Sequence, residues 1–225
     1  SGMIAPDMAT MLSFIFTDAK IPALVLQRLL KDAANRSFNS ITVDSDTSTS
    51  DTMLLAATGQ AKHSRVTGVR DKHLKAFRDA LRGIAIDLAS QVVRDGEGAQ
   101  KFVTIDISGA ESAAAARRIG LTVANSPLVK TAIAGGDPNW GRIVMAVGKA
   151  GEKADRDRMS IGMGGVWITD EGQLVEGYDE SAAGKHMAGR DISIAVDVGV
   201  GHGKARVWTC DLTHGYVEIN ADYRT

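Results

Sequence analysis

The sequence predicts an α+β fold in which sheets and helices pack in layers. Segments with helical spacing between residues 22 and 134 are enclosed by strand-like segments at residues 11–16 and 160–225. The chain has 225 residues, 44% of them hydrophobic, and can therefore bury a sizeable core. Because no linker, repeat or low-complexity tract divides it, we expect a single α+β unit.

The first elements are predicted as a strand, a helix and a polar loop. Residues 11–16 form a short apolar run, which predicts a buried strand. Thr17 and Asp18 are candidate N-caps of the next helix, and Pro22 fits its first turn. Apolar residues recur with helical spacing on one face of this helix: Leu24, Leu26, Leu29, Leu30 and Ala33. Residues 40–58 then read as a loop dense in Thr, Ser and Asp, followed by a short apolar segment.

The clearest helix is predicted over residues 71–94. Its apolar residues alternate by three and four, with charges between them, at Leu74, Phe77, Leu81, Ile84 and Leu88. Gly83 costs this helix about 1 kcal/mol and is a candidate for close packing. Residues 94–98 are predicted as a turn rather than a helical continuation.

The rest of the chain is predicted mainly as strands. Two short helices are expected first, at residues 111–118 and 127–134, and Gly135 and Gly136 break the second. Alternating or apolar runs predict strands at residues 101–108, 142–147, 161–168, 192–198, 205–212 and 216–220.

Composition excludes several classes of protein. A net charge of −1 provides no electrostatic footprint for nucleic acid or an anionic membrane. The single cysteine, Cys210, excludes an internal disulfide framework and suits a reducing compartment. No apolar run approaches the roughly 20 residues that span a bilayer. With the single cysteine, this favours the cytoplasm. No His or Cys cluster has zinc-site spacing, so we expect no metal.

Ala9 and Thr10 form the first chemically informative pair. A small residue before a threonine suits backbone self-cleavage, because the hydroxyl must reach the preceding carbonyl. Cleavage between them would give Thr10 a free α-amino group with a reference pKa of about 7.7–8.0. That amine can serve as general base for the hydroxyl. An ordinary strand threonine remains the alternative on local chemistry alone.

Five ordered blocks resemble the ornithine acetyltransferase family, also called the bifunctional glutamate N-acetyltransferases. They are Ser1-Gly-Met-Ile-Ala-Pro-Asp-Met-Ala-Thr-Met-Leu12, Ile41-Thr-Val-Asp-Ser-Asp-Thr-Ser-Thr-Ser-Asp-Thr52, Arg94-Asp-Gly-Glu-Gly-Ala99, Gly136-Asp-Pro-Asn-Trp-Gly-Arg-Ile143 and Tyr216-Val-Glu-Ile-Asn-Ala-Asp-Tyr-Arg-Thr225. The resemblance covers the whole chain. It implies a self-processing fold of the N-terminal-nucleophile-like type. Residues 1–9 are then the tail of an α chain, and residues 10–225 a catalytic β chain.

The same resemblance implies an activity and its partners. The expected reaction is acetyl transfer from N-acetyl-ornithine to glutamate, in arginine biosynthesis, through an acetyl ester on Thr10. No cofactor is expected, although acetyl-CoA is a possible second donor. The expected partner is the α chain of the same precursor, in an α₂β₂ heterotetramer. The family's oxyanion hole and a substrate-binding lysine precede residue 1.

The resemblance also assigns substrate-binding residues. Glu97 lies between two glycines, which allows a turn to present its carboxylate closely to a ligand. Asn220 and Thr225 match the family's residues for the glutamate moiety, together with Thr10 itself. Where relatives commonly read Ala-Thr-Lys, this chain reads Ala99-Gln100-Lys101, which weakens any role for position 100. The block at 136–143 reads as a rigid turn, with Asp137 or Asn139 orienting neighbours.

Two alternatives stay open at this stage. An amidase or aminopeptidase of the same self-processing fold would use water as the acyl acceptor. A non-catalytic binding subunit would need neither Thr10 nor cleavage. Retention of Glu97, Asn220 and Thr225 favours the transferase, because a peptidase has no need of a glutamate-shaped pocket.

Overall fold

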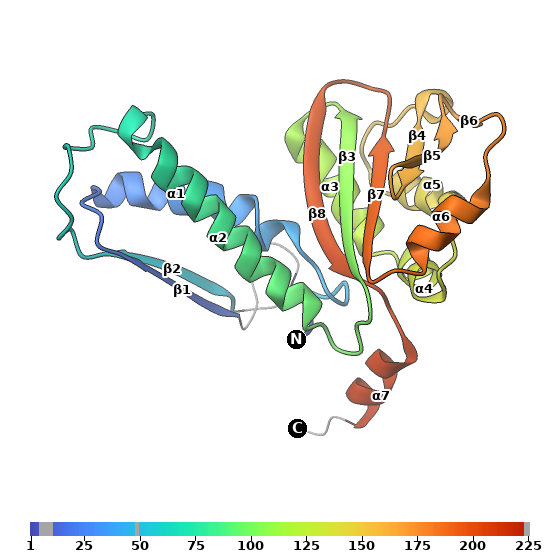
Figure 1. Ribbon diagram of the computed structural model, residues 1–225, viewed down its shortest axis with the longest axis horizontal. Helices are drawn as coiled ribbons and strands as arrows, with labels where there is room; N and C mark the ends of the chain where they lie inside the picture. Colours follow the sequence, from blue (N-terminus) through green and yellow to red (C-terminus); the bar gives the residue numbers. More distant parts are fainter. Residues whose placement is uncertain (5–10, 48–49, 223–225) are drawn as a thin grey trace.

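A computed structural model describes residues 1–4, 11–47 and 50–222 and has the predicted α+β architecture, arranged as two lobes (Figure 1). The two-stranded lobe contains β1 (Leu12–Thr17), α1 (Ala23–Asn35), η1 (Phe38–Ser40), β2 (Thr52–Ala57), η2 (Lys72–Leu74) and α2 (Lys75–Arg94). The six-stranded lobe contains β3 (Phe102–Ala110), α3 (Ala113–Ala124), α4 (Pro127–Gly135), α5 (Trp140–Gly148), η3 (Arg156–Arg158), β4 (Ser160–Met163), β5 (Val166–Asp170), β6 (Gln173–Leu174), α6 (Glu180–Met187), β7 (Asp191–Asp197) and β8 (Gly203–Cys210). A C-terminal helix, α7 (His214–Asp222), follows β8.

In the two-stranded lobe, β1 and β2 pair in parallel, with Leu12 opposite Thr52. One face of this small sheet packs on α1 and α2, and Ile15 and Leu55 join their apolar core. The other face is open, because Phe16 is 75% exposed and its face neighbours on β1 are also exposed. The strand prediction is therefore confirmed, but the expected complete burial of β1 is wrong within this chain.

Both long helices of this lobe form as predicted, with different buried faces. Helix α1 begins after Pro22, no side chain among the described residues caps it, and the cap expected from Thr17 or Asp18 is not formed. Its buried residues are Val25, Leu29 and Ala33, whereas Leu24 is 81% exposed. Helix α2 buries Leu81, Ala85, Ala89 and Val93 and leaves Ile84 half exposed. A Cβ on Gly83 would meet open space, so the close packing expected there is wrong.

The six-stranded lobe is a mixed sheet with the strand order β6-β5-β4-β7-β3-β8. The central strand β3 is parallel to β7 and antiparallel to β8. Alternate residues of β3 face a core that α3, α4, α5 and α6 complete on one side. These buried residues are Val103, Ile105 and Ile107. The period-2 pattern at 101–108 thus predicted both the strand and its buried face.

Several predicted strands are helices or hairpins. Residues 142–147 lie in helix α5, because Asn139 caps its first turn and the apolar run packs on the core at helical spacing. Residues 161–168 contain a turn at Gly164 and Gly165, both with positive φ, and therefore divide into the antiparallel pair β4 and β5. Helix α6 was not predicted.

The C-terminal segment differs most from its prediction. Residues 216–220, expected as a strand tied into a sheet, belong to helix α7, which projects from the end of β8 in Figure 1. Thr213 starts this helix, since its hydroxyl accepts from Gly215 N at 3.1 Å and its carbonyl from Tyr216 N at 3.2 Å. None of the α7 residues is buried. Across the described residues, no helix has the length and apolar content needed to span a bilayer.

Candidate active site

Two of the predicted site residues meet in the structure. The amide of Asn220 on α7 donates from Nδ2 to Oε2 of Glu97 at 2.9 Å, although 123 positions separate them in the sequence. The other predicted residues, Ala9, Thr10 and Thr225, lie outside the described residues. The geometry can therefore be built around Glu97 and Asn220 alone.

The turn that carries Glu97 is held by close backbone packing. Gly98 has φ +69°, and a Cβ there would lie 2.4 Å from Tyr216 N, so only glycine fits. A Cβ on Gly96 would approach Cys210 Sγ and the Val43 side chain at 3.1 Å each. The glycines on both sides of Glu97 thus allow the turn to lie directly against the start of α7 and the end of β8.

Helix α7 depends on a few polar contacts with this turn. The Thr213 hydroxyl donates to the carbonyl of Gly98 at 2.7 Å. The Asn220 amide also donates to Tyr216 O, one helical turn back, at 3.0 Å. Because α7 buries no side chain of its own, these contacts determine where Asn220 lies relative to Glu97.

The first residues of the chain pass between two carboxylates. Glu97 N donates to Ser1 O at 2.8 Å, and Met3 N donates to Oδ2 of Asp44 at 2.7 Å. A Cβ placed on Gly2 would lie 3.0 Å from Asp44 Oδ2 and 3.1 Å from Glu97 Oε2. Residues 1–4 therefore place the chain between Asp44 and Glu97 before it enters the segment that contains Ala9 and Thr10.

The polar loop at 41–51 supplies residues that sequence reasoning missed. Asp44 accepts a hydrogen bond from Met3 N, which precedes residues 5–10 in the chain. Asp51 accepts one from Met11 N, which follows them. Burial raises the pKa of Asp51, and the Met11 N–H opposes that change. The density of Asp, Ser and Thr in this loop was the available signal, but it is equally typical of a solvated loop.

Acidic groups dominate the described part of this site. Burial raises the pKa of Tyr216, and the nearby carboxylates of Asp44 and Glu97 raise it further. Tyr216 therefore stays a neutral phenol beside these two carboxylates. Such an arrangement can accept hydrogen bonds from an ammonium group or an amide N–H of a ligand.

The Gly136–Ile143 block has an architectural role within the described contacts. Asn139 Oδ1 accepts from Arg142 N at 3.2 Å and so caps α5, while its Nδ2 donates to Asp137 Oδ2 at 3.1 Å. Arg142 donates to the carbonyl of Leu128 on α4 at 2.7 Å. Asp137 and Asn139 thus orient their own neighbours, and no described hydrogen bond joins them to Glu97 or Asn220.

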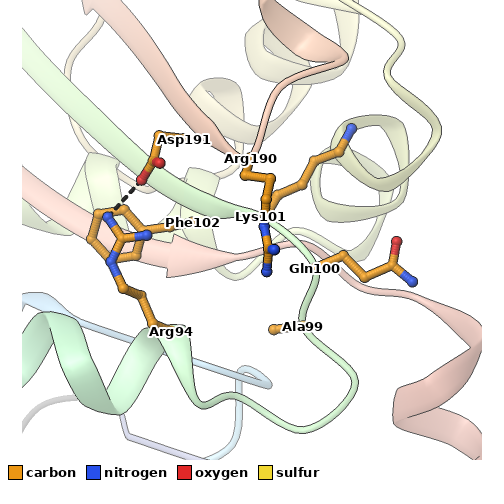
Figure 2. Close-up of a pocket in the computed structure, with 7 residues that line it drawn as sticks. All are labelled: Arg94, Ala99, Gln100, Lys101, Phe102, Arg190 and Asp191. Atoms are coloured by element: carbon orange, nitrogen blue, oxygen red, sulfur yellow. Dashed lines mark hydrogen bonds and ion pairs between the residues drawn. The ribbon is translucent and has the colours of Figure 1, made fainter.

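A separate hollow of about 170 Å³ lies beyond the Glu97 turn (Figure 2). Its lining residues are Arg94, Ala99, Gln100, Lys101, Phe102, Arg190 and Asp191. Arg94 pairs with Asp191 at 2.5 Å and stacks 4.0 Å from the centre of the Phe102 ring. Lys101 points away to the carbonyls of Ile133 and Met187. The hollow therefore contains none of the predicted site residues.

In the described part of the chain, no group of three or more His, Cys, Asp or Glu side chains is arranged to hold a metal ion.

Comparisons with known proteins identify the family. The ArgJ family model matches residues 1–225. The chain is 60% identical over 225 residues to the arginine biosynthesis bifunctional protein ArgJ of Gluconobacter oxydans, covering all of this chain and 53% of that protein. The ArgJ protein of Zymomonas mobilis is 55% identical, again over this whole chain and 55% of its own length. The chain thus spans about half the length of the curated relatives it matches.

A solved structure is also similar. The crystal structure of arginine biosynthesis bifunctional protein ArgJ from Bacillus halodurans superposes with a TM-score of 0.91 at 38% identity, covering 95% of this chain and 100% of that one. A solved structure that carries the same ArgJ name as the curated relatives therefore has the α+β fold described above. With the family model matched from end to end, the chain belongs to the ArgJ family.

Proposed function

We propose that this chain carries the nucleophile and the amino-acid site of a glutamate N-acetyltransferase that moves acetyl from N-acetyl-ornithine to glutamate. One observation carries the proposal: Glu97 and Asn220, far apart in sequence, are hydrogen-bonded beside the segment that leads to Ala9 and Thr10. Membership of the ArgJ family supports it, because the relatives are named as arginine biosynthesis proteins.

The proposed chemistry has two acyl transfers on Thr10. After cleavage of the Ala9–Thr10 bond, the α-amino group of Thr10 takes the hydroxyl proton as Oγ attacks the acetyl carbonyl. The C–N bond to ornithine breaks, and its amine leaves with that proton. Glutamate then attacks the ester with its own amine, and the Thr10 oxygen leaves and regains a proton.

The described carboxylates fit the substrates of this reaction. Both N-acetyl-ornithine and glutamate are amino-acid derivatives, so one site can hold each in turn. Glu97 can accept from a substrate ammonium or amide N–H. Oδ1 of Asn220 can accept in the same way, while the two Nδ2 hydrogens of that amide are donated to Glu97 and to Tyr216 O. Thr225 is proposed to complete the same end of the pocket.

The proposed partner is the α chain of the same precursor. The curated relatives are nearly twice as long as this chain, which leaves room for such a companion. The outer face of the β1–β2 sheet exposes Leu12, Phe14, Phe16 and Leu54, and parallel sheets are ordinarily covered on both faces. We propose that the α chain covers this face and supplies the oxyanion donors and a lysine, within an α₂β₂ assembly in the cytoplasm. The mechanism uses no cofactor, and acetyl-CoA is a possible second donor.

The test compares variants of the full-length precursor by intact mass and acetyl transfer. Thr10→Ala should abolish both cleavage and transfer, because one hydroxyl serves both reactions. Glu97→Ala is the matched control, since substrate is absent during cleavage. This variant should cleave normally. Its kcat/KM for acetyl transfer should fall by the equivalent of about 1.5–3 kcal/mol, which is the contribution of a hydrogen bond to a charged group.

Distinct results would contradict each part. A Thr10→Ala precursor that still splits into two chains would remove Thr10 from self-cleavage. Wild-type protein that releases acetate from N-acetyl-ornithine, without forming N-acetyl-glutamate, would identify an amidase instead of a transferase. The decisive product is N-acetyl-glutamate, measured by mass spectrometry after incubation with N-acetyl-ornithine and glutamate.

A further inference from the structure

Lys130 on α4 is the bulkiest fully buried side chain of the described residues, with 1% of its surface exposed. Its Nζ donates to Thr209 Oγ1 at 3.0 Å and to the carbonyl of Cys210, and lies 3.7 Å from Cys210 Sγ. No described carboxylate forms an ion pair with it, and burial lowers its pKa. Burying an ammonium group costs free energy unless its hydrogen bonds are satisfied, so this interior position calls for a specific role.

The groups that Lys130 contacts lie at the end of β8 and in the linker to α7, residues 211–213. Besides the contact from Nζ to Cys210 O, the Lys130 carbonyl accepts from Leu212 N at 3.3 Å. Lys130 therefore contacts the end of β8 through its side chain and the linker through its backbone. Cys210 Sγ in turn lies against the Glu97 turn, where it would be 3.1 Å from a Cβ on Gly96.

On its other side, the linker forms hydrogen bonds with the loop that follows Glu97. Asp211 Oδ1 accepts from Gln100 N at 2.8 Å and from Lys101 N at 2.9 Å. The Thr213 hydroxyl then reaches Gly98 O, immediately before α7 begins. A continuous set of contacts thus runs from the Lys130 ammonium through the linker to the helix that bears Asn220.

The Asp211 carboxylate gives the linker a second charge in the interior. Its Oδ2 is buried and has no hydrogen-bond partner among the residues that the structure describes. Lys130 and Asp211 lie close enough to interact electrostatically, as do Lys130 and Asp44. Both carboxylates raise the pKa of Lys130 against the larger effect of burial, and so favour its charged form.

We propose that Lys130 is a positioning residue of the amino-acid site: it fixes the β8–α7 linker so that Asn220 meets Glu97. This inference rests on the proposed function, because it assumes that these two residues bind substrate. Lys130 itself does not contact the substrate. Its removal should therefore weaken substrate capture through Asn220 and leave the chemical step largely intact.

The test uses Lys130→Met, Asn220→Ala and the double variant in the full-length processed protein. Lys130→Met should raise KM for both N-acetyl-ornithine and glutamate by about tenfold and change kcat by less than about threefold. In the Asn220→Ala background it should change KM by less than about twofold, because the group it acts through is already gone. Equal increases in both backgrounds, or an unchanged KM in folded Lys130→Met, would overturn the proposal.

Lys101→Met is the control for losing a hydrogen-bonded, partly buried ammonium group elsewhere in the same lobe. Its Nζ donates to the carbonyls of Ile133 and Met187, which lie outside the linker. We expect a lower melting temperature and a KM within about twofold of wild type. A KM increase as large as that of Lys130→Met would indicate general loosening and overturn the specific role of Lys130.

A milder variant keeps the proposal testable if Lys130→Met does not fold. Thr209→Val preserves the shape and the lysine but removes one Nζ acceptor, and should raise KM about threefold only when Asn220 is present. No increase would overturn the proposal. A wild-type protein without acetyl transfer would overturn the proposed function instead. In that case amide hydrogen exchange in α7 tests whether Lys130 holds the linker. Exchange should be faster in Lys130→Met than in wild type, and equal rates would contradict the proposal.

Discussion

The two lobes bury one face of their sheets in the same way but differ on the other face. The outer face of the six-stranded sheet is polar at the middle of β3, where Arg206 pairs with Asp106 through two bonds of 2.7 and 2.9 Å. At one end of the same face, Phe102 and Trp208 join an apolar cluster with Val93 of α2. The outer face of β1 carries Leu12, Phe14 and Phe16, all exposed. A sheet face that meets water is ordinarily polar. The outer face of β3 and β8 is thus either polar or packed within this chain, whereas the outer face of β1 is apolar and exposed.

Helix caps follow the same division. The helices of the six-stranded lobe start with side-chain N-caps at Ser112, Ser126, Asn139 and Asp179. Among the described residues, no side chain caps α1 or α2 themselves, although Asp71 caps the short η2 turn that leads into α2. Caps satisfy backbone N–H groups that packing would otherwise have to protect. The two-stranded lobe thus relies more on packing, including packing that this chain alone does not provide.

The largest expected difference compares one apolar residue from each sheet. Ile105 in β3 is fully buried, so Ile105→Ala should lower the free energy of unfolding by about 2–5 kcal/mol. Phe16→Ser should change the stability of this chain by less than about 0.5 kcal/mol, as at other exposed positions. It should, however, lower the amount of the proposed α chain that co-purifies with this chain. Chemical denaturation measures the first effect and denaturing electrophoresis the second.

Each half of this comparison can fail separately. Complete recovery of the companion chain with Phe16→Ser would show that the outer face of β1 does not take part in that interface. An Ile105→Ala protein as stable as wild type would mean that the β3 core relaxes to fill the cavity. Ile105→Val, which removes one methylene, is the graded control and should cost about 0.5–1.5 kcal/mol.

The sequence predicted elements best where the hydrophobic period was long. The α2 helix and the β3 strand appear close to their expected bounds, because many residues repeat the same period. Residues 142–147 and 216–220 were predicted wrongly as strands, since short apolar runs suit either element. The local caps decided both cases, Asn139 for α5 and Thr213 for α7.

The site was predictable only in part, and for a physical reason. The Asp-Gly-Glu-Gly turn marks Glu97 locally, and the family resemblance marks Asn220. Their contact and the roles of Asp44 and Lys130 depend on pairings across the fold. Lys130 in particular looks like an ordinary helix-surface lysine in sequence, and only its burial reveals otherwise.

A smaller effect tests the difference in caps. Ser112 Oγ accepts from Ala115 N at 3.1 Å at the start of α3, so Ser112→Ala should cost about 1 kcal/mol. Thr17 Oγ1 accepts from Ala19 N at 3.2 Å in a turn before α1, so Thr17→Ala should cost only a few tenths of a kcal/mol. Ser112→Thr retains the hydroxyl and is the control. Equal losses for the two alanine variants, measured by urea denaturation, would contradict the proposed division.

The smallest expected effect concerns pH and the start of α2. Asp71 accepts from His73 N at 3.0 Å and Thr67 N at 3.1 Å, and these hydrogen bonds lower the pKa of its carboxyl from 3.8 to about 2. Because the folded pKa lies below the unfolded one, its contribution to stability is complete above about pH 4 and is lost as the pH falls toward 2. Asp71→Asn keeps the size of the side chain and removes this titration. The gap in urea midpoint between wild type and Asp71→Asn should therefore shrink between about pH 5 and about pH 2.5. A gap that stays constant or widens would mean that Asp71 does not stabilise the two-stranded lobe through its charge.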